Sequence, residues 1–176
     1  MNRLLLISGS ARGDGNTALT VAHLRRALEL ADDQIIDLQS CRLEPFRYAP
    51  PPPADDFLGI VDRLLAHRHL IFATPVYWYA MSGLMKTFFD RLTDLLIDPA
   101  GRRLGRALAG RQMWLIATGT DPALPDGFTE PFARTADYFA MHWRGAFYVR
   151  VPKDPLPAGH EFPEVETLAA AIAESP

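Results

Sequence analysis

The sequence has only one cysteine, Cys41, among its 176 residues. A single thiol excludes an intrachain disulfide framework and a cysteine-ligated iron–sulfur cluster, so Cys41 is expected to be a small, partly buried side chain. Long hydrophobic runs are also missing, and none approaches the ~20 apolar residues of a membrane-spanning helix. The first run, Leu4–Ile7, is too short for the core of a signal peptide. We therefore expect a cytoplasmic protein with no membrane contact.

An excess of charge of one sign is lacking as well. The 18 Lys and Arg residues against 21 Asp and Glu give a net charge of −3, and no basic run is interleaved with aromatics. A nucleic-acid partner is therefore not expected. Among the five histidines, His67 and His69 span a predicted helix end and strand start, which is poor geometry for a metal site, and His160 lies near the C-terminus. The absence of a Gly-x-Ser-x-Gly motif argues against a hydrolase.

What is present is the composition of an ordinary globular domain, with 48% hydrophobic and 22% charged residues. The length suits one domain, predicted to span residues 1–176. Short apolar runs recur along the chain, and they are continuous rather than alternating, as in strands buried on both faces of a parallel sheet. These predicted strands are Leu4–Ile7, Ile35–Leu38, Leu70–Ala73, Met113–Ala117 and Ala146–Val149.

Helical patterns separate the strands: one after 16–17, one over 56–67, one from Ser82 through Leu96, and two over 128–142 and 162–174. Asn16 or Thr17 is predicted to cap the first helix. The alternation predicts a flavodoxin-like three-layer α/β sandwich, with a five-stranded parallel sheet of order 2-1-3-4-5 and helices on both faces.

Two segments, one charged and one rich in proline, are expected to have structural roles rather than to bind a ligand. Lys86, Asp90 and Arg91 on the third helix are predicted to form a solvated charged face. The run Pro50–Pro53 is predicted to be a rigid connector, with a ligand for a proline-reading domain as the alternative.

The loop after the first strand carries the strongest chemical signal. It runs from Ser8 to Thr17 into a helix N-terminus, where free backbone N–H groups and the helix dipole favour an anion. Ser10, Asn16 and Thr17 can donate to phosphate oxygens, and Arg12 adds a positive charge. The loop is therefore predicted to hold a phosphate.

The spacing of this loop also decides between other nucleotide-binding motifs. A Walker A loop is excluded because no Gly-Lys-Ser/Thr follows. Residues 13–18 satisfy the dinucleotide fingerprint, with Asp37 placed as a ribose-binding acid, but that fingerprint needs its first glycine directly after the strand. Here five residues separate Ile7 from Gly13, which favours a terminal phosphate monoester. A dinucleotide site and an ordinary strand-to-helix turn remain the alternatives.

Two further segments follow neighbouring strands. Pro75–Ser82 contains Tyr77, Trp78 and Tyr79, which are costly to leave exposed and could cover a planar ring. Tyr77 and Trp78 are predicted to face a ligand, and Tyr79 to pack against a neighbouring loop or another subunit. Residues 118–120 could present hydroxyl or backbone groups to the edge of a heteroaromatic ring.

Together, Ser-Gly-Ser-x-Arg-x-x-Gly-Asn-Thr from Ser8 and Pro-Val-Tyr-Trp-Tyr-x-Met-Ser-x-x-x-Lys-x-Phe-x-Asp-Arg from Pro75 resemble the NAD(P)H-dependent FMN reductase and quinone reductase superfamily. The resemblance covers about residues 3–120. Iron–sulfur relatives carry a cysteine cluster after the second strand, whereas this chain has Cys41 alone. The resemblance implies three groups of FMN-binding residues: Ser10, Arg12, Asn16 and Thr17 at the phosphate; Pro75, Val76, Tyr77 and Trp78 along the isoalloxazine; and Thr118, Gly119 and Thr120 at its pyrimidine end.

The implied function is an FMN-dependent oxidoreductase that passes two electrons from NADPH or NADH to a quinone, azo, nitro or flavin acceptor. No side chain is named as catalytic, because the cofactor supplies the chemistry. The alternatives are a non-enzymatic electron carrier and a regulatory FMN-binding protein, although a charge of −3 fits a carrier poorly. The resemblance also implies a homodimer or homotetramer whose other partner is a small-molecule electron acceptor.

Overall fold

The computed structural model describes residues 4–48, 55–151 and 161–175. The predicted connector Pro50–Pro53 and His160 lie outside these ranges. Five parallel strands form one sheet in the order β2-β1-β3-β5-β6, and a short β4 pairs antiparallel with β3. Counting the parallel strands alone, this is the predicted order 2-1-3-4-5. The strands are β1 Leu4–Ser8, β2 Ile35–Asp37, β3 His69–Tyr77, β4 Ala80–Met81, β5 Gln112–Gly119 and β6 His142–Arg150.

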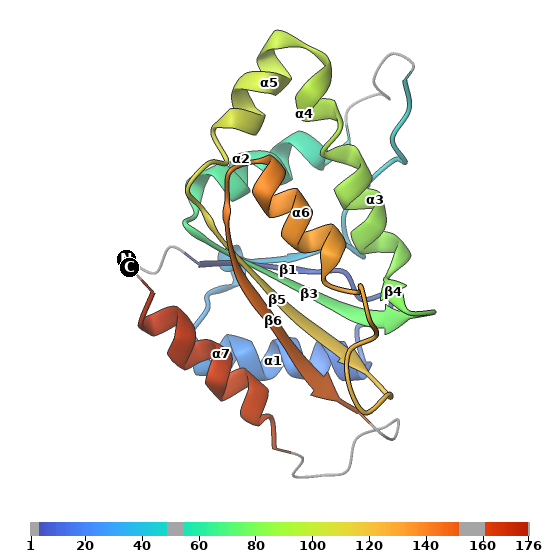
Figure 1. Cartoon of the computed structure of the whole chain (residues 1–176), viewed down its shortest axis with the longest axis vertical. Coiled ribbons are helices and arrows are strands. Elements are labelled where there is room, and N and C mark those ends of the chain that lie inside the picture. The colour runs from blue at the N-terminus through green and yellow to red at the C-terminus, as the bar shows by residue number, and fades with distance from the viewer. Residues whose placement is uncertain (1–3, 49–54, 152–160, 176) are drawn as a thin grey trace.

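Helices cover both faces of the sheet, as predicted (Figure 1). One face packs against α1 and α7, and the other against α2, α3 and α6, with α4 and α5 on the same side but farther from the sheet. The helices are α1 Asn16–Ala27, α2 Phe57–Ala66, α3 Gly83–Arg91, α4 Asp94–Ile97, α5 Pro99–Arg106, α6 Glu130–Tyr138 and α7 Pro163–Ala173.

The pleat of β1 explains why the strand sequences are continuously apolar. Leu5 and Ile7 belong to the core beneath α2, α3 and α6, whereas Leu4 and Leu6 belong to the core beneath α1 and α7. Successive side chains of a strand point to opposite faces, so a sheet covered on both sides buries every residue. The fold class is therefore confirmed as flavodoxin-like α/β.

The third predicted helix does not run unbroken from Ser82 through Leu96. It ends at Arg91, and i→i−3 hydrogen bonds such as Leu92 N to Phe89 O (3.1 Å) tighten the chain before α4 begins. A further helix, α5, was not predicted, although its start is marked by the side chain of Asp98, which accepts from Gly101 N, and by a proline at its first position. The apolar periodicity alone could not separate three consecutive helical pieces.

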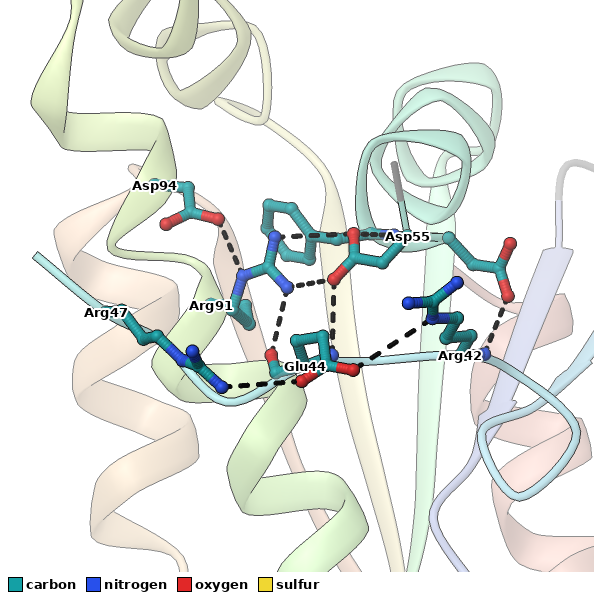
Figure 2. Close-up of polar contacts among 8 residues, drawn as sticks. Arg42, Glu44, Arg47, Asp55, Arg91 and Asp94 are labelled. Carbon is teal, nitrogen blue, oxygen red and sulfur yellow. Dashed lines mark hydrogen bonds and ion pairs between the residues drawn. The ribbon is translucent and has the colours of Figure 1, made fainter. Parts of the chain in front are cut away.

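Arg91 is buried, which corrects the prediction that it lies on a solvated face (Figure 2). Lys86 and Asp90 do form an exposed i,i+4 pair, but Arg91 lies one residue further around the helix and turns inward. Its guanidinium contacts the Asp55 carboxylate, donates to Asp94 Oδ2 at 2.6 Å, and lies 4.7 Å from the centre of the Phe57 ring. The pair with Asp55 ties the β2–α2 connection to α3.

The same network makes stability depend on acid. Burial would raise the pKa of Asp55, but hydrogen bonds from Arg91 and from the N–H groups of Phe57 and Glu44 lower it below its ordinary value. The unfolded carboxyl, with a pKa of about 3.9, therefore binds its proton first as pH falls. Stability from Asp55 is complete above about pH 5 and is lost progressively below about pH 4. Urea unfolding from pH 6 to pH 3 should show a steeper loss for the wild type than for Asp55→Asn, and equal slopes would contradict this.

Candidate functional site

Three predicted segments meet at the carboxyl edge of the sheet. Thr17 at the start of α1 and Thr118 near the end of β5 are 101 residues apart, and their hydroxyl oxygens lie 2.5 Å from each other. Gly9 N donates to Ala73 O at 2.8 Å, which joins the loop after β1 to β3. Pro75 stands opposite Thr118 in the β3–β5 ladder. The structure thus places the predicted phosphate loop beside the ends of both neighbouring strands.

The first turn of α1 has no side-chain cap, so the predicted caps Asn16 and Thr17 are wrong. The N-cap is Gly15, in extended backbone (φ −85°, ψ 176°), and Asn16 is the first helical residue. The first N–H groups of a helix have no partner within the helix. Without a capping side chain they remain available to an anion at the N-terminus of α1.

The loop before α1 keeps its shape through its own hydrogen bonds. The buried Ser10 hydroxyl donates to Arg12 O at 2.9 Å and accepts from Arg12 N at 3.2 Å. Gln39, just after β2, donates from Nε2 to Ala11 O at 2.9 Å. The Ser10 hydroxyl therefore donates its proton within the loop, to the Arg12 carbonyl, and this hydrogen bond stabilises the shape of the loop.

Two side chains of this segment, Arg12 and Asn16, could bind a ligand directly. Arg12 Nε lies 3.2 Å from Asp14 Oδ1, and both side chains are more than half exposed. Such an exposed ion pair contributes little, so Arg12 can exchange Asp14 for another anion at small cost. Asn16 Oδ1 is buried and has no hydrogen-bond partner among the described residues. A ligand with an anionic group could pair with Arg12, and a hydroxyl on the same ligand could donate to Asn16 Oδ1.

The aromatic segment is a tight hairpin, and the prediction that the third strand ends at Ala73 is wrong. β3 continues to Tyr77 and pairs with β4 through Val76 opposite Met81 and Tyr77 opposite Ala80. Trp78 and Tyr79 form the turn, with φ of +49° and +65°. Both central residues of a type I′ hairpin turn take left-handed φ, which is strained for bulky side chains.

The three aromatic side chains are all exposed in this chain. Trp78 is 93% exposed, Tyr79 69% and Tyr77 43%. Tyr79 therefore does not pack against a neighbouring loop of its own chain, and its packing against another subunit stays a prediction. Exposed aromatic surface at one edge of a sheet marks a binding or contact surface.

The end of β5 is shaped by close packing. A Cβ added to Gly119 would lie 2.7 Å from the Tyr148 hydroxyl and 3.2 Å from Val76 Cβ, so only glycine fits there. Thr118 is buried and Thr120 exposed. Tyr148, on β6, was not identified from sequence, because nothing in its own neighbourhood distinguishes it from other strand residues.

Ser82 is a second residue that sequence reasoning missed. Its hydroxyl donates to Gly9 O and accepts from Met85 N at 3.1 Å, which caps α3. The signal was a serine directly before a helical pattern, a common N-cap. Ser82 thereby ties the start of α3 to the loop after β1.

Other chemistries find little support in the part of the chain that the structure describes. No group of three or more His, Cys, Asp or Glu side chains there could hold a metal ion. None of the described helices combines the length and apolarity needed to cross a membrane. His69 is buried, which lowers its pKa, and its Nδ1 accepts from Trp114 Nε1 at 3.3 Å.

Comparison with known proteins agrees with this geometry. The family model described as NADPH-dependent FMN reductase matches residues 2–129. YwqN of Bacillus subtilis, whose name gives it as a proposed NAD(P)H-dependent FMN-containing oxidoreductase, is 31% identical over 151 residues, covering 81% of this chain and 82% of YwqN.

Solved structures share the fold. The Trp repressor binding protein of Bacillus subtilis has a TM-score of 0.67 and 27% identity over 87% of each chain. General stress protein 14 of Treponema denticola, solved in complex with FMN, has a TM-score of 0.60 and 19% identity, covering 97% of this chain and 95% of its own. At that identity the second likeness shows the fold alone.

Proposed function

The chain belongs to the NADPH-dependent FMN reductase family and is an NAD(P)H-dependent FMN oxidoreductase, and from this premise we propose that it reduces a quinone, azo, nitro or free-flavin acceptor. NADPH or NADH would supply the two electrons. The observation that carries the proposal is the contact between Thr17 and Thr118, which joins the phosphate loop to the strand end where a ring would lie.

The residues of the site suit FMN as the cofactor. Arg12 and the free N–H groups of α1 would hold its phosphate, with Thr17 beside them and Ser10 fixing the loop. The unpartnered Asn16 Oδ1 would accept from a ribityl hydroxyl. The ring would lie along Pro75, Val76, Tyr77 and Trp78, with its pyrimidine end toward Thr118, Gly119 and Thr120.

The protein's own contribution to the reaction is placement. When bound, FMN supplies hydride acceptance from the nicotinamide and electron donation to the acceptor. The exposed faces of Tyr77 and Trp78 would bring a planar co-substrate close to the ring, and proximity of stacked reactants lowers the barrier. None of the named site residues needs to act as an acid or a base in this scheme.

A second subunit is also part of the proposal. The hairpin residues Trp78 and Tyr79 are exposed, and an apolar groove of about 380 Å³ lies between α3 and α6, lined by Phe89, Leu96 and Phe139 among others. Both are surfaces that a homodimer or homotetramer would cover. The other proposed partner is a small-molecule electron acceptor.

The function is tested by purification and turnover. We expect the protein to carry FMN, released by heat and identified by chromatography, and to oxidise NADPH or NADH when a quinone is added. Bound FMN without oxidation of either nicotinamide would contradict the reductase function and favour an electron carrier. A colourless protein that FMN titration cannot saturate would contradict both.

A further inference from the structure

The turn at the end of β5 is held from β6 by two hydrogen bonds. Val151 N, one residue beyond β6, donates to Gly119 O at 2.7 Å. The Tyr148 hydroxyl donates to Asp121 O at 2.8 Å. The carbonyls at both ends of the Gly119–Asp121 turn are therefore directed toward β6.

This anchoring determines where the next donor points. In a trans peptide, the N–H of Thr120 lies opposite the carbonyl of Gly119. Since that carbonyl is directed toward β6, the Thr120 N–H faces the β3 side of the sheet. It has no hydrogen-bond partner among the described residues, and the β3–β5 ladder ends at Pro75 and Thr118. An exposed, unused donor thus faces the strand end that carries Val76 and Tyr77.

Tyr148 is suited to holding this turn. Its hydroxyl lies over Gly119, where the missing side chain leaves space for it, and Val76 packs against the same space. Burial and the nearby Asp121 carboxylate raise the pKa of Tyr148, although Arg150 opposes them, so the hydroxyl keeps its proton and remains a donor. The hydrogen bond to Asp121 O spans 27 residues and fixes a loop that has no regular structure of its own.

We propose that Tyr148 is a positioning residue for the flavin: it holds the Gly119–Asp121 turn so that the Thr120 N–H donates to the pyrimidine end of the ring. This inference rests on the proposed binding of FMN. Negative charge gathers at that end of the ring on reduction, so a fixed donor there stabilises reduced flavin more than oxidised flavin.

The test compares Tyr148→Phe with Tyr138→Phe, which removes a hydroxyl from an exposed ring on α6. For Tyr148→Phe we expect reduced FMN to bind about three- to tenfold more weakly relative to oxidised FMN, the scale of one hydrogen bond. That loss lowers the midpoint potential of bound FMN by about 15–30 mV, since tenfold corresponds to about 30 mV for two electrons. Tyr138→Phe should keep the wild-type potential.

The outcomes separate this inference from the function on which it rests. If wild-type protein binds FMN and oxidises a nicotinamide, but Tyr148→Phe keeps the wild-type potential, the positioning role is wrong and the function stands. A loss of folding stability without a change in potential would likewise reduce Tyr148 to a packing residue. If the wild-type protein does not bind FMN, both proposals fail.

Discussion

Replacing Arg91 with alanine is expected to lower the free energy of unfolding by about 3–5 kcal/mol, the usual cost of removing one partner from a buried ion pair. The side chains of Arg91 and Asp55 are each 5% exposed. Alanine would leave the Asp55 carboxylate desolvated and unpaired. It would also remove the donor to Glu44 O (3.0 Å) and the cation over the Phe57 ring.

Matched variants identify the cause of that loss. Lys86→Ala breaks the exposed pair with Asp90 on the same helix and should cost at most about 1 kcal/mol. The double change Arg91→Met with Asp55→Asn removes both buried charges and should cost less than Arg91→Ala alone, because no unpaired ion is left. Urea unfolding at pH 7 measures all of them. Equal losses for Arg91→Ala and Lys86→Ala would contradict the buried-pair explanation.

The position of Arg91 connects the core to the candidate site. It is the last residue of α3, and Ser82, the N-cap of the same helix, donates to Gly9 O in the loop after β1. The helix is therefore tied to the β2–α2 connection at one end and to the predicted phosphate loop at the other. Because α3 also follows directly from the β3–β4 hairpin, a loose α3 would disturb the hairpin and the loop together.

The sheet could be predicted because a strand that is buried on both faces is continuously apolar, and such a run can be recognised in the sequence. Runs such as Leu4–Ile7 and Met113–Ala117 have the length and continuous apolarity of strands buried on both faces, and both lie within strands. The extension of β3 to Tyr77 could not be predicted, because a proline at position 75 normally argues against a continuing strand. The inward turn of Arg91 was equally hidden, since its partner Asp55 lies 36 residues away.

The contiguous part of the candidate site could be predicted from the sequence, but its contacts between distant residues could not. The phosphate loop is contiguous, so its glycines, hydroxyls and arginine can be recognised together in the sequence. Ser82 and Tyr148 donate to carbonyls 73 and 27 residues away in the sequence, and no local sequence pattern predicts such contacts. The caps of α1 were predicted wrongly for a related reason: a suitable side chain at Asn16 does not show whether the helix begins before it or after it.

Replacing Arg12 with alanine is expected to weaken FMN binding by about 1–3 kcal/mol, or roughly five- to 150-fold in Kd. In the structure Arg12 is paired with Asp14, and both side chains are well exposed. Giving up that exposed pair costs little. Titration of apoprotein with FMN, followed by the quenching of flavin fluorescence, measures the change.

Riboflavin, which lacks the phosphate, provides the decisive comparison. If Arg12 acts on the phosphate, Arg12→Ala should leave riboflavin affinity unchanged while FMN affinity falls. Arg134→Ala, on the exposed face of α6, removes an equal charge from a surface arginine paired with Glu130 and should change neither. A fall in riboflavin affinity equal to that for FMN would show that Arg12 supports the ring or the loop instead. Unchanged FMN affinity would show that Arg12 does not contact the cofactor, and the phosphate would then depend on the rest of the loop and the backbone N–H groups of α1.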